Sequence, residues 1–181
     1  MRVTVVPYDQ ALRANLETIL SGTVYISIEH VGSTSVPNLY AKPVLDVDII
    51  VPSDSDITPV VDRLAAHGYL YGGERNIPGR HIVSAPDQDP ARNMYVCVDG
   101  CLGLRNHLAV RDVLRADDLL REEYGRLKME LAGREWNHIG EYVEAKGVVL
   151  QKILEKASIS AEDLESIRKV NDVAQIPPNP Q

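Results

Sequence analysis

Residues 23–51 read TVYISIEHVGSTSVPNLYAKPVLDVDIIV, and they carry the main signals for the fold. Its first nine residues alternate between apolar and polar, with Val24, Ile26 and Ile28 on one face, which is typical of a half-buried strand. A Gly-Ser-Thr-Ser-Val-Pro turn follows, and residues 43–51 form a second run that is rich in branched apolar residues, as strands prefer. The stretch therefore predicts two strands that are joined through a glycine-serine turn.

The residues around this stretch predict more strands and the first helices. Apolar residues recur at helical spacing over residues 9–21 and again over residues 56–67. Three further short strands are expected at residues 69–71, 81–84 and 94–98, where glycine, proline and aspartate turns separate them. The first half of the chain is therefore expected to form a small mixed β-sheet flanked by helices.

From Leu104 onward the apolar spacing is helical almost to the end of the chain. One helix is expected over residues 104–114, a second after the cap residue Asp117, a third over residues 138–156, and a short one after the cap residue Ser160. Strands followed by helices predict an α+β fold, in which the small mixed sheet precedes a helical C-terminal half.

The chain has 181 residues, which is enough for one domain with a short tail. We expect the domain to cover residues 1–158, with a sheet part at about residues 1–102 and a helical part at about residues 103–158. Residues 159–181 are expected to form a C-terminal helix and a flexible tail, because the prolines near the end cannot continue a helix.

The composition limits the classes of function. The chain carries 19 lysine and arginine residues against 26 aspartate and glutamate residues, and this acidic balance argues against broad nucleic-acid binding. No apolar run approaches the ~20 residues that span a bilayer, and the first residues do not resemble a signal peptide, so a cytoplasmic protein without membrane association is expected. Cys97 and Cys101 are expected to be reduced thiols beside a turn. The oligomeric state stays open.

Asp46 and Asp48 lie two residues apart on the second expected strand, so both carboxylates point to the same face. Two carboxylates this close among apolar residues repel each other, and a divalent cation would relieve the repulsion. Mg²⁺, or Mn²⁺ in its place, commonly takes one or two carboxylates together with phosphate oxygens. The alternative is that both aspartates lie at an exposed strand end and have no function.

The turn between the two strands has residues that suit phosphate binding. Gly32 lacks a Cβ and lets a ligand approach the backbone, and the serine and threonine residues after it offer hydroxyl and N–H groups. A glycine-serine turn alone is more often a simple loop. In combination, Gly32 and Ser33 on one side and Asp46 and Asp48 on the other predict phosphate-binding and cation-binding groups at one end of the sheet.

The same residues resemble a known family. The run Glu29-His-Val-Gly-Ser-Thr-Ser-Val-Pro37, followed by Asp46-Val-Asp48, is similar to the GrpB-like family of the nucleotidyltransferase superfamily. That superfamily carries a hydrophobic-Gly-Gly/Ser motif and, after a short interval, an Asp-hydrophobic-Asp motif, and here twelve residues separate Ser33 from Asp46. Further similar segments extend the resemblance over about residues 5–155.

The resemblance implies a nucleotidyltransferase-like fold and a metal-dependent transfer of a nucleoside monophosphate from a nucleoside triphosphate to an unknown small-molecule acceptor. It implies that Gly32 and Ser33 hold the β- and γ-phosphates and that Asp46 and Asp48 are the catalytic residues that hold Mg²⁺. The usual third carboxylate, or the His-x-His pair of many GrpB-like members, is replaced here by Asn93-Met-Tyr95. The alternative is therefore a protein that binds a nucleotide or a phosphorylated cofactor with a degenerate catalytic site.

Six basic residues are candidates for phosphate binding, namely Lys42, Arg80, Arg111, Arg115, Lys128 and Lys146. Lys42 precedes the aspartate strand, and its alternative is a solvated loop lysine. Arg80 follows a proline-glycine turn from which it could reach the same cleft. Arg111 and Arg115 share one helix face and could clamp a phosphate. Their alternative partners are neighbouring aspartates, namely Asp112, Asp117 and Asp118.

Four further residues are expected beside the site, namely His30, Tyr95, Tyr124 and Tyr142. His30 is expected on the aspartate-facing side of its strand, and Tyr95 stands where the family often has a histidine. Tyr124 with Lys128 repeats the spacing of Tyr142 with Lys146, and each pair offers a ring and an ammonium group to an anion. The alternative is that the rings pack in the core and the lysines are solvated.

Overall fold

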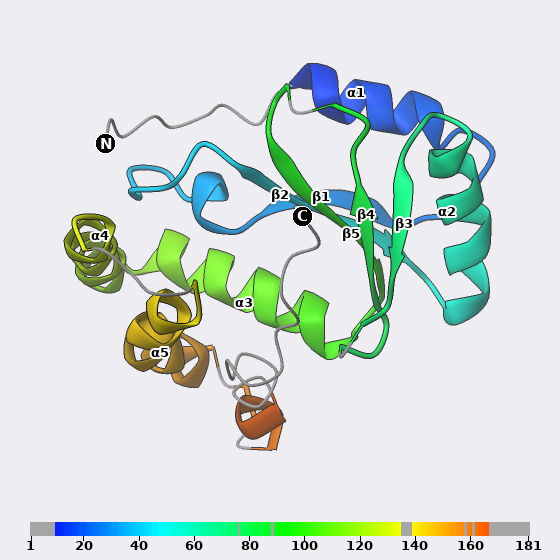
Figure 1. Cartoon of the computed structure of the whole chain (residues 1–181). Coiled ribbons are helices and arrows are strands. Elements are labelled where there is room, and N and C mark those ends of the chain that lie inside the picture. The colour runs from blue at the N-terminus through cyan, green and yellow to red at the C-terminus, as the bar shows by residue number, and fades with distance from the viewer. Residues whose placement is uncertain are drawn as a thin grey trace.

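The computed structural model describes residues 10–75, 77–87, 89–134, 139–157, 159–160 and 162–166, and within residues 139–146 it describes the backbone alone. Five strands form one sheet in the order β1-β2-β5-β4-β3 (Figure 1). Their bounds are β1 Ser27–Val31, β2 Leu45–Val51, β3 Leu70–Gly73, β4 Arg80–Ser84 and β5 Arg92–Val98. β2 and β5 pair in parallel, and the other neighbours pair antiparallel. The expected mixed sheet is confirmed.

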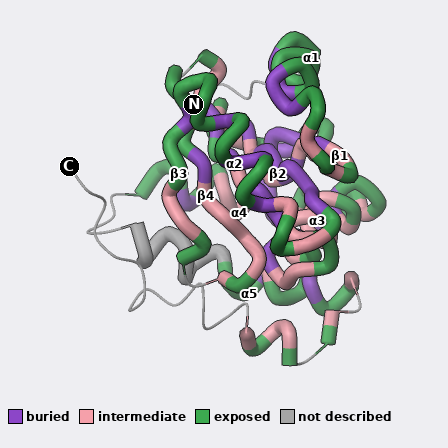
Figure 2. Tube along the Cα trace, turned by 90° about the vertical axis from the view of Figure 1, so that its right-hand side faces the viewer, coloured by how far each residue is buried: buried purple, intermediate pink, exposed green. Residues whose placement is uncertain are grey.

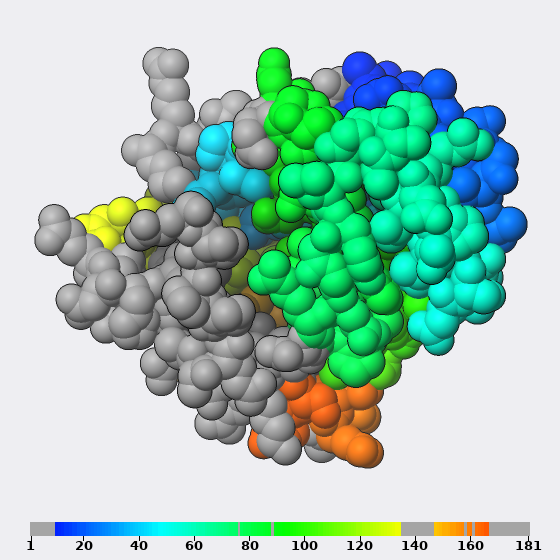
Figure 3. All heavy atoms as spheres, turned by 45° about the vertical axis from the view of Figure 1, so that its right-hand side comes forward, coloured from blue at the N-terminus to red at the C-terminus, as the bar shows by residue number. Residues whose placement is uncertain are grey.

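Helices α1 (Gln10–Ile19) and α2 (Ile57–Ala65) cover one face of the sheet. Their apolar sides pack against inward-facing residues of the central strands, such as Val47 and Val96, and form the main hydrophobic core. Buried residues gather in β2 (Figure 2), and the outer sides of α1, α2, β3 and β4 form one surface (Figure 3). The sheet face that lies under α1 and α2 is apolar around β2 and β5. This face therefore contributes to stability, and the candidate site does not lie on it.

The other face of the sheet meets the helical half. Helix α3 (Leu102–Ala116) packs on β2 and β5 through Leu104, and α4 (Asp118–Ala132) and α5 (Ile139–Lys156) pack beside α3 (Figure 1). A second hydrophobic cluster joins the loop after β1 to these helices, with members Val36, Leu39, Leu114, Leu120, Tyr124, Val149 and Ile153. The loop that carries the glycine-serine turn is therefore anchored in the helical half.

The expected N-terminal caps of two helices are confirmed. The carboxylate of Asp117 accepts a hydrogen bond from the N–H of Leu120 at 3.0 Å, and the hydroxyl of Ser160 accepts one from the N–H of Asp163 at 3.1 Å. The helical C-terminal half follows the sheet as expected, and the two cysteine thiols are free. Among the described helices, none combines the length and the apolar character that a bilayer crossing requires.

The first expected strand is shorter than its alternation pattern indicates. Val24 and Ile26 are 59% and 53% exposed, although the pattern places them on the buried face with Ile28. The register with β2 begins at Ser27, and before it only the N–H of Ile26 still donates to the carbonyl of Ile50, at 2.7 Å, so the buried face of the strand does not extend to these two side chains. Tyr25 packs against the core instead. The expectation for Val24 and Ile26 is therefore wrong.

Candidate functional site

The glycine-serine turn begins where β1 ends. Gly32 has φ of 66° and ψ of −169°, a conformation that is essentially restricted to glycine, and residues 33–35 continue as a short 3-10 turn. The hydroxyl of Ser35 donates to the carbonyl of Gly32 at 2.6 Å and closes the turn. A Cβ at Gly32 would overlap Oδ2 of Asp46 and lie 2.8 Å from its Cγ. Because Gly32 has no side chain, the carboxylate of Asp46 can pack directly against the backbone of the turn.

Asp46 and Asp48 lie on one face of β2, as expected. Across the antiparallel pair with β1, Asp48 is in register with Glu29, and across the parallel pair with β5, Asp46 is in register with Asn93. The amide Nδ2 of Asn93 donates to Oδ1 of Asp46 at 2.8 Å. Burial raises the pKa of Asp46 above its ordinary value, although the hydrogen bond from Asn93 opposes the rise.

Asp48 is fully buried, with 0% exposure, and contacts a histidine from α3. Nδ1 of His107 lies 2.8 Å from Oδ2 of Asp48, and it donates because an ionised carboxylate only accepts. Burial lowers the pKa of His107, but the charge and hydrogen bond of Asp48 outweigh burial and raise it overall. Oδ1 of Asp48 is buried and has no hydrogen-bond partner within the described residues.

This donor set fits a small divalent cation. Each aspartate has one oxygen bound by a neighbouring N–H, and within the described part of the chain Oδ1 of Asp48 is left without a partner. An unpaired buried carboxylate oxygen is costly, and a cation would satisfy it. No group of three or more histidine, cysteine, aspartate or glutamate side chains among the described residues is arranged to hold a metal ion. The aspartate pair alone would therefore supply the protein ligands, with phosphate oxygens and water completing the shell.

Strand β5 places Tyr95 beside the aspartates, in register with Asp48. The ring of Tyr95 lies 5.5 Å from that of His107, and the guanidinium of Arg80 lies 4.8 Å from the ring centroid of Tyr95. Burial raises the pKa of Tyr95 to about 12, so it stays a neutral phenol. A Cβ at Gly103 would lie 2.9 Å from Cδ of Arg80, so α3 packs closely on the arginine side chain. Tyr95 and Arg80 thus lie in the site region.

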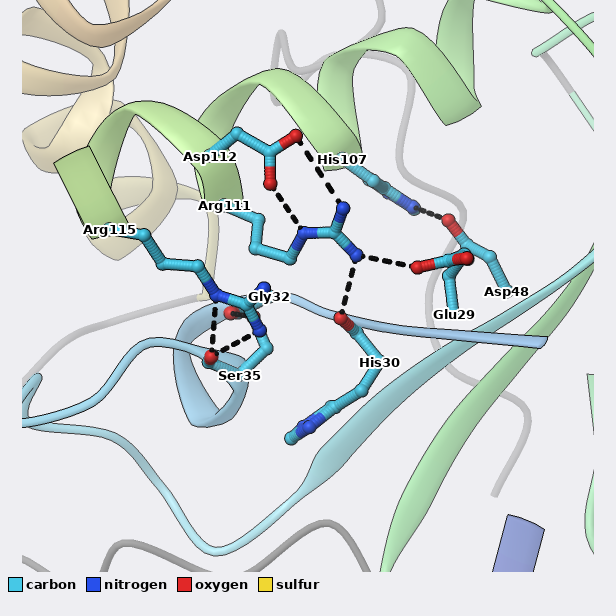
Figure 4. A network of polar contacts seen from close by, with 9 residues as sticks. All are labelled: Glu29, His30, Gly32, Ser35, Asp48, His107, Arg111, Asp112 and Arg115. Carbon is cyan, nitrogen blue, oxygen red and sulfur yellow. Dashed lines mark hydrogen bonds and ion pairs between the residues drawn. The ribbon is translucent and has the colours of Figure 1, made fainter. Parts of the chain in front are cut away.

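One face of α3 holds the aspartate strand and the turn together (Figure 4). His107, Arg111 and Arg115 follow each other at spacings of four residues and therefore share that face. Arg111 donates to Oε2 of Glu29 at 2.8 Å and to the carbonyl of residue 30 at 3.3 Å, and Arg115 donates to the carbonyl of Ser35 at 2.7 and 3.1 Å. In this structure Arg111 binds the end of β1 and Arg115 binds the turn, and their role as a phosphate clamp stays a prediction.

Of the three aspartates expected as alternative partners of Arg111 and Arg115, one forms an ion pair with Arg111. Arg111 pairs with Asp112 at 2.7 Å, in addition to its contacts with β1. Asp117 instead pairs with Lys156, and Asp118 pairs with Arg121 at 2.8 Å.

Lys128 reaches the turn from α4. Its Nζ donates to Oγ of Ser33 and to the carbonyl of Tyr40 at 3.1 Å, and it lies 4.7 Å from the ring centroid of Tyr124. The ring of Tyr124 is only 4% exposed and belongs to the second hydrophobic cluster. Tyr124 therefore packs in the core beneath the lysine and does not line an open cleft, whereas Lys128 lies at the expected phosphate loop.

The remaining candidates have other positions. His30 is in register with Val47, so its side chain lies on the face opposite the aspartates, where Nε2 is 2.9 Å from the hydroxyl of Thr34. The expectation that His30 faces the aspartates is therefore wrong, because the register pairs Glu29 with Asp48. Lys42 is exposed in the loop before β2. The side chains of Tyr142 and Lys146 lie outside the described residues.

The role of His107 was not anticipated from the sequence. Its contact with Asp48 joins residues that are 59 apart along the chain. The one local signal is the spacing that it shares with Arg111 and Arg115 on α3.

Comparisons with known proteins identify a family for this chain and a similar fold. The profile of the GrpB protein family matches residues 2–156. The UPF0157 protein BH1888 of Halalkalibacterium halodurans is 36% identical over 138 residues, which cover 76% of this chain and 70% of that protein. The UPF0157 protein SCO7215 of Streptomyces coelicolor is 34% identical over 132 residues, which cover 73% of this chain and 69% of that protein. The crystal structure of the conserved protein GrpB from Enterococcus faecalis superposes with a TM-score of 0.69 at 30% identity, covering 81% of this chain and 88% of that one. This chain belongs to the GrpB protein family.

Proposed function

We propose that this chain binds a nucleoside triphosphate together with Mg²⁺ or Mn²⁺ and transfers the nucleoside monophosphate to a small-molecule acceptor. The observation that carries the proposal is the contact between Gly32 and Asp46, which brings a turn suited to phosphate and a carboxylate suited to a cation to one point. Such a pairing of groups is what a bound triphosphate-cation complex requires.

The residues of the turn would hold the β- and γ-phosphates. The first N–H groups of a helical turn have no partner inside the turn, so those that follow Gly32 can donate to phosphate oxygens. Lys128 adds a positive charge through its contact with Ser33. Arg80 offers a second positive charge above Tyr95, on the side of β5. These groups would hold the leaving pyrophosphate in place.

The aspartates would act at the other end of the triphosphate. Asp46 and Asp48 would hold the cation, which neutralises the leaving group and orients the acceptor oxygen when it is bound. In the transfer, the acceptor oxygen would bond to the α-phosphorus while the bond from that phosphorus to the bridging oxygen of pyrophosphate breaks, and the proton of a hydroxyl acceptor would pass to water. The protein's contribution is then positioning and charge, as is general for phosphoryl transfer.

A second candidate is a protein that binds a nucleotide or a phosphorylated cofactor without transferring it. Asn93 and Tyr95 favour this version, because they take the places in register with the two aspartates and neither offers a carboxylate. Release of pyrophosphate separates the two candidates. Its appearance with any acceptor in a metabolite screen would support transfer, and triphosphate binding without release would support the binding protein.

The test of the shared site is the thermal stability of the protein with Mg²⁺ and a panel of nucleoside triphosphates. A free triphosphate concentration of ~100 times its Kd adds ~2.7 kcal/mol to the free energy of unfolding. This should raise the Tm by ~5–10 °C for a chain of this size. Asp46→Asn and Asp48→Asn should abolish the shift. Asp62→Asn, an exposed aspartate on the opposite side in α2, should retain it. Shifts of equal size in all three variants would contradict the proposed site.

A further inference from the structure

Each of the two aspartates accepts a hydrogen bond from a neighbouring side chain through one of its two carboxylate oxygens. Asn93 donates to Oδ1 of Asp46 and His107 donates to Oδ2 of Asp48, both at 2.8 Å. Oδ1 of Asp48 is buried without a partner in the described part of the chain, and Oδ2 of Asp46 faces the bare backbone of Gly32. One oxygen of each aspartate therefore accepts a hydrogen bond that fixes the orientation of the carboxylate, and the other is left without an N–H donor in the described part of the chain and is turned toward a ligand.

Two-cation sites need more carboxylate oxygens than this. Their cations lie ~3.5–4 Å apart, and carboxylates must bridge them or hold each one separately. The neighbouring strand β5 offers a neutral amide at Asn93 and a phenol at Tyr95 where a further carboxylate would have to be. On the other side, the carboxylate of Glu29 is bound by Arg111 at 2.8 Å. Neither neighbouring strand adds a free carboxylate to the pair.

We infer that the aspartate pair holds one divalent cation and not two, and that Asn93 and His107 are positioning residues that turn one oxygen of each aspartate toward that cation. The inference rests on the cation site of the proposed function and applies equally to the transferase and to the binding protein. Hydrogen bonds to carboxylate ligands commonly tune a metal site in this way, and their loss typically costs 10–100-fold in metal affinity.

The experiment is a titration of the full chain with Mn²⁺ alone, in which electron paramagnetic resonance reports the free ion. The wild type should bind one Mn²⁺. Asn93→Asp adds a carboxylate in register with Asp46 and should bind two. Asn93→Ala removes the donor without adding a carboxylate, so it should still bind one, but more weakly.

The role of His107 is tested in the same titration. His107→Ala should weaken Mn²⁺ binding about 10–100-fold. His107→Asn keeps a side-chain N–H near the place of Nδ1 and should restore most of the affinity, which a purely structural role of the imidazole ring would not predict. His67→Ala is the matched control, because His67 lies beyond α2 and contacts the carbonyl of Arg63. It should bind like the wild type, and the Tm of each variant checks that it is folded.

The possible failures point to different errors. Two Mn²⁺ ions in the wild type, or one in Asn93→Asp, would overturn the inference while leaving the proposed function intact. Wild-type affinity in both His107 variants would overturn the positioning role. No Mn²⁺ binding by the wild type would overturn the cation site of the proposed function and the inference with it.

Discussion

The substitution Gly32→Ala tests whether the glycine-serine turn and the aspartate pair form one site. At Gly32 the backbone has φ of 66° and ψ of −169°. A methyl group there would overlap Oδ2 of Asp46 and lie 2.8 Å from Cγ and 2.9 Å from Cβ, well inside the usual carbon contact of ~3.5–4.0 Å. Gly100 is a matched control, since its φ is 71° and a Cβ there would meet no atom within 4 Å.

The expected magnitudes follow from these two environments. Placing a non-glycine residue at positive φ costs ~1–2 kcal/mol, and both variants carry at least this cost, while the ψ of −169° at Gly32 belongs to a region that is essentially restricted to glycine. Only Gly32→Ala adds the overlap with Asp46, and forcing extra atoms into a packed position typically costs ~1–3 kcal/mol. We therefore expect the free energy of unfolding to fall by ~2–5 kcal/mol in Gly32→Ala and by ~1–2 kcal/mol in Gly100→Ala.

Urea denaturation followed by circular dichroism measures these free energies. A double-mutant cycle isolates the contact, because Asp46→Gly removes all three atoms that the new methyl group would meet. In that background Gly32→Ala should cost ~1–3 kcal/mol less than in the wild type. Equal costs for the two alanine variants, together with no coupling in the cycle, would show that the turn and Asp46 do not share one site.

Three further predictions concern single side chains. Burial, followed by the charges of Arg115 and Arg111, lowers the pKa of His30 from 6.5 to about 4, so protonation favours the unfolded chain. The free energy of unfolding should therefore fall as the pH drops from 6.5 through 4, and less so in His30→Gln, as urea titrations at each pH would measure; identical profiles would contradict this. Arg115→Gln loses the hydrogen bonds of the guanidinium to Ser35 and should cost ~1–3 kcal/mol in the same assay and weaken triphosphate binding in calorimetry. Tyr124→Ala should cost ~3–5 kcal/mol because the ring is in the core, whereas Tyr124→Phe should bind triphosphate like the wild type; loss of binding at full stability in the Phe variant would point to a ligand contact instead.

Much of the fold could be predicted from local patterns. The alternation over β2 correctly placed Asp46 and Asp48 on one face, because side chains in a strand point alternately to its two sides. The caps of the later helices were correctly read from Asp117 and Ser160, because a cap depends on residues within one turn. The closeness of Gly32 to the aspartates also followed from the short connection between their strands.

Positions that depend on register were harder to predict. His30 was expected beside the aspartates, but the antiparallel register pairs Glu29 with Asp48 and turns His30 to the other face. A shift of one residue in register moves every side chain to the opposite face, and nothing within β1 alone specifies which residue of β2 it meets. The same limit applies to Val24 and Ile26, whose alternation continues beyond the point where pairing begins.

Local sequence patterns are sufficient to predict the order of strands and helices, the glycine at the turn and the shared face of Asp46 and Asp48, because each depends on residues that are close along the chain. Which side chains bind those carboxylates depends on tertiary packing. Asn93 is 47 residues from Asp46, and His107 is 59 residues from Asp48. These contacts depend on the parallel pairing of β2 with β5 and on the path of α3 across the sheet, and packing between distant segments sets both.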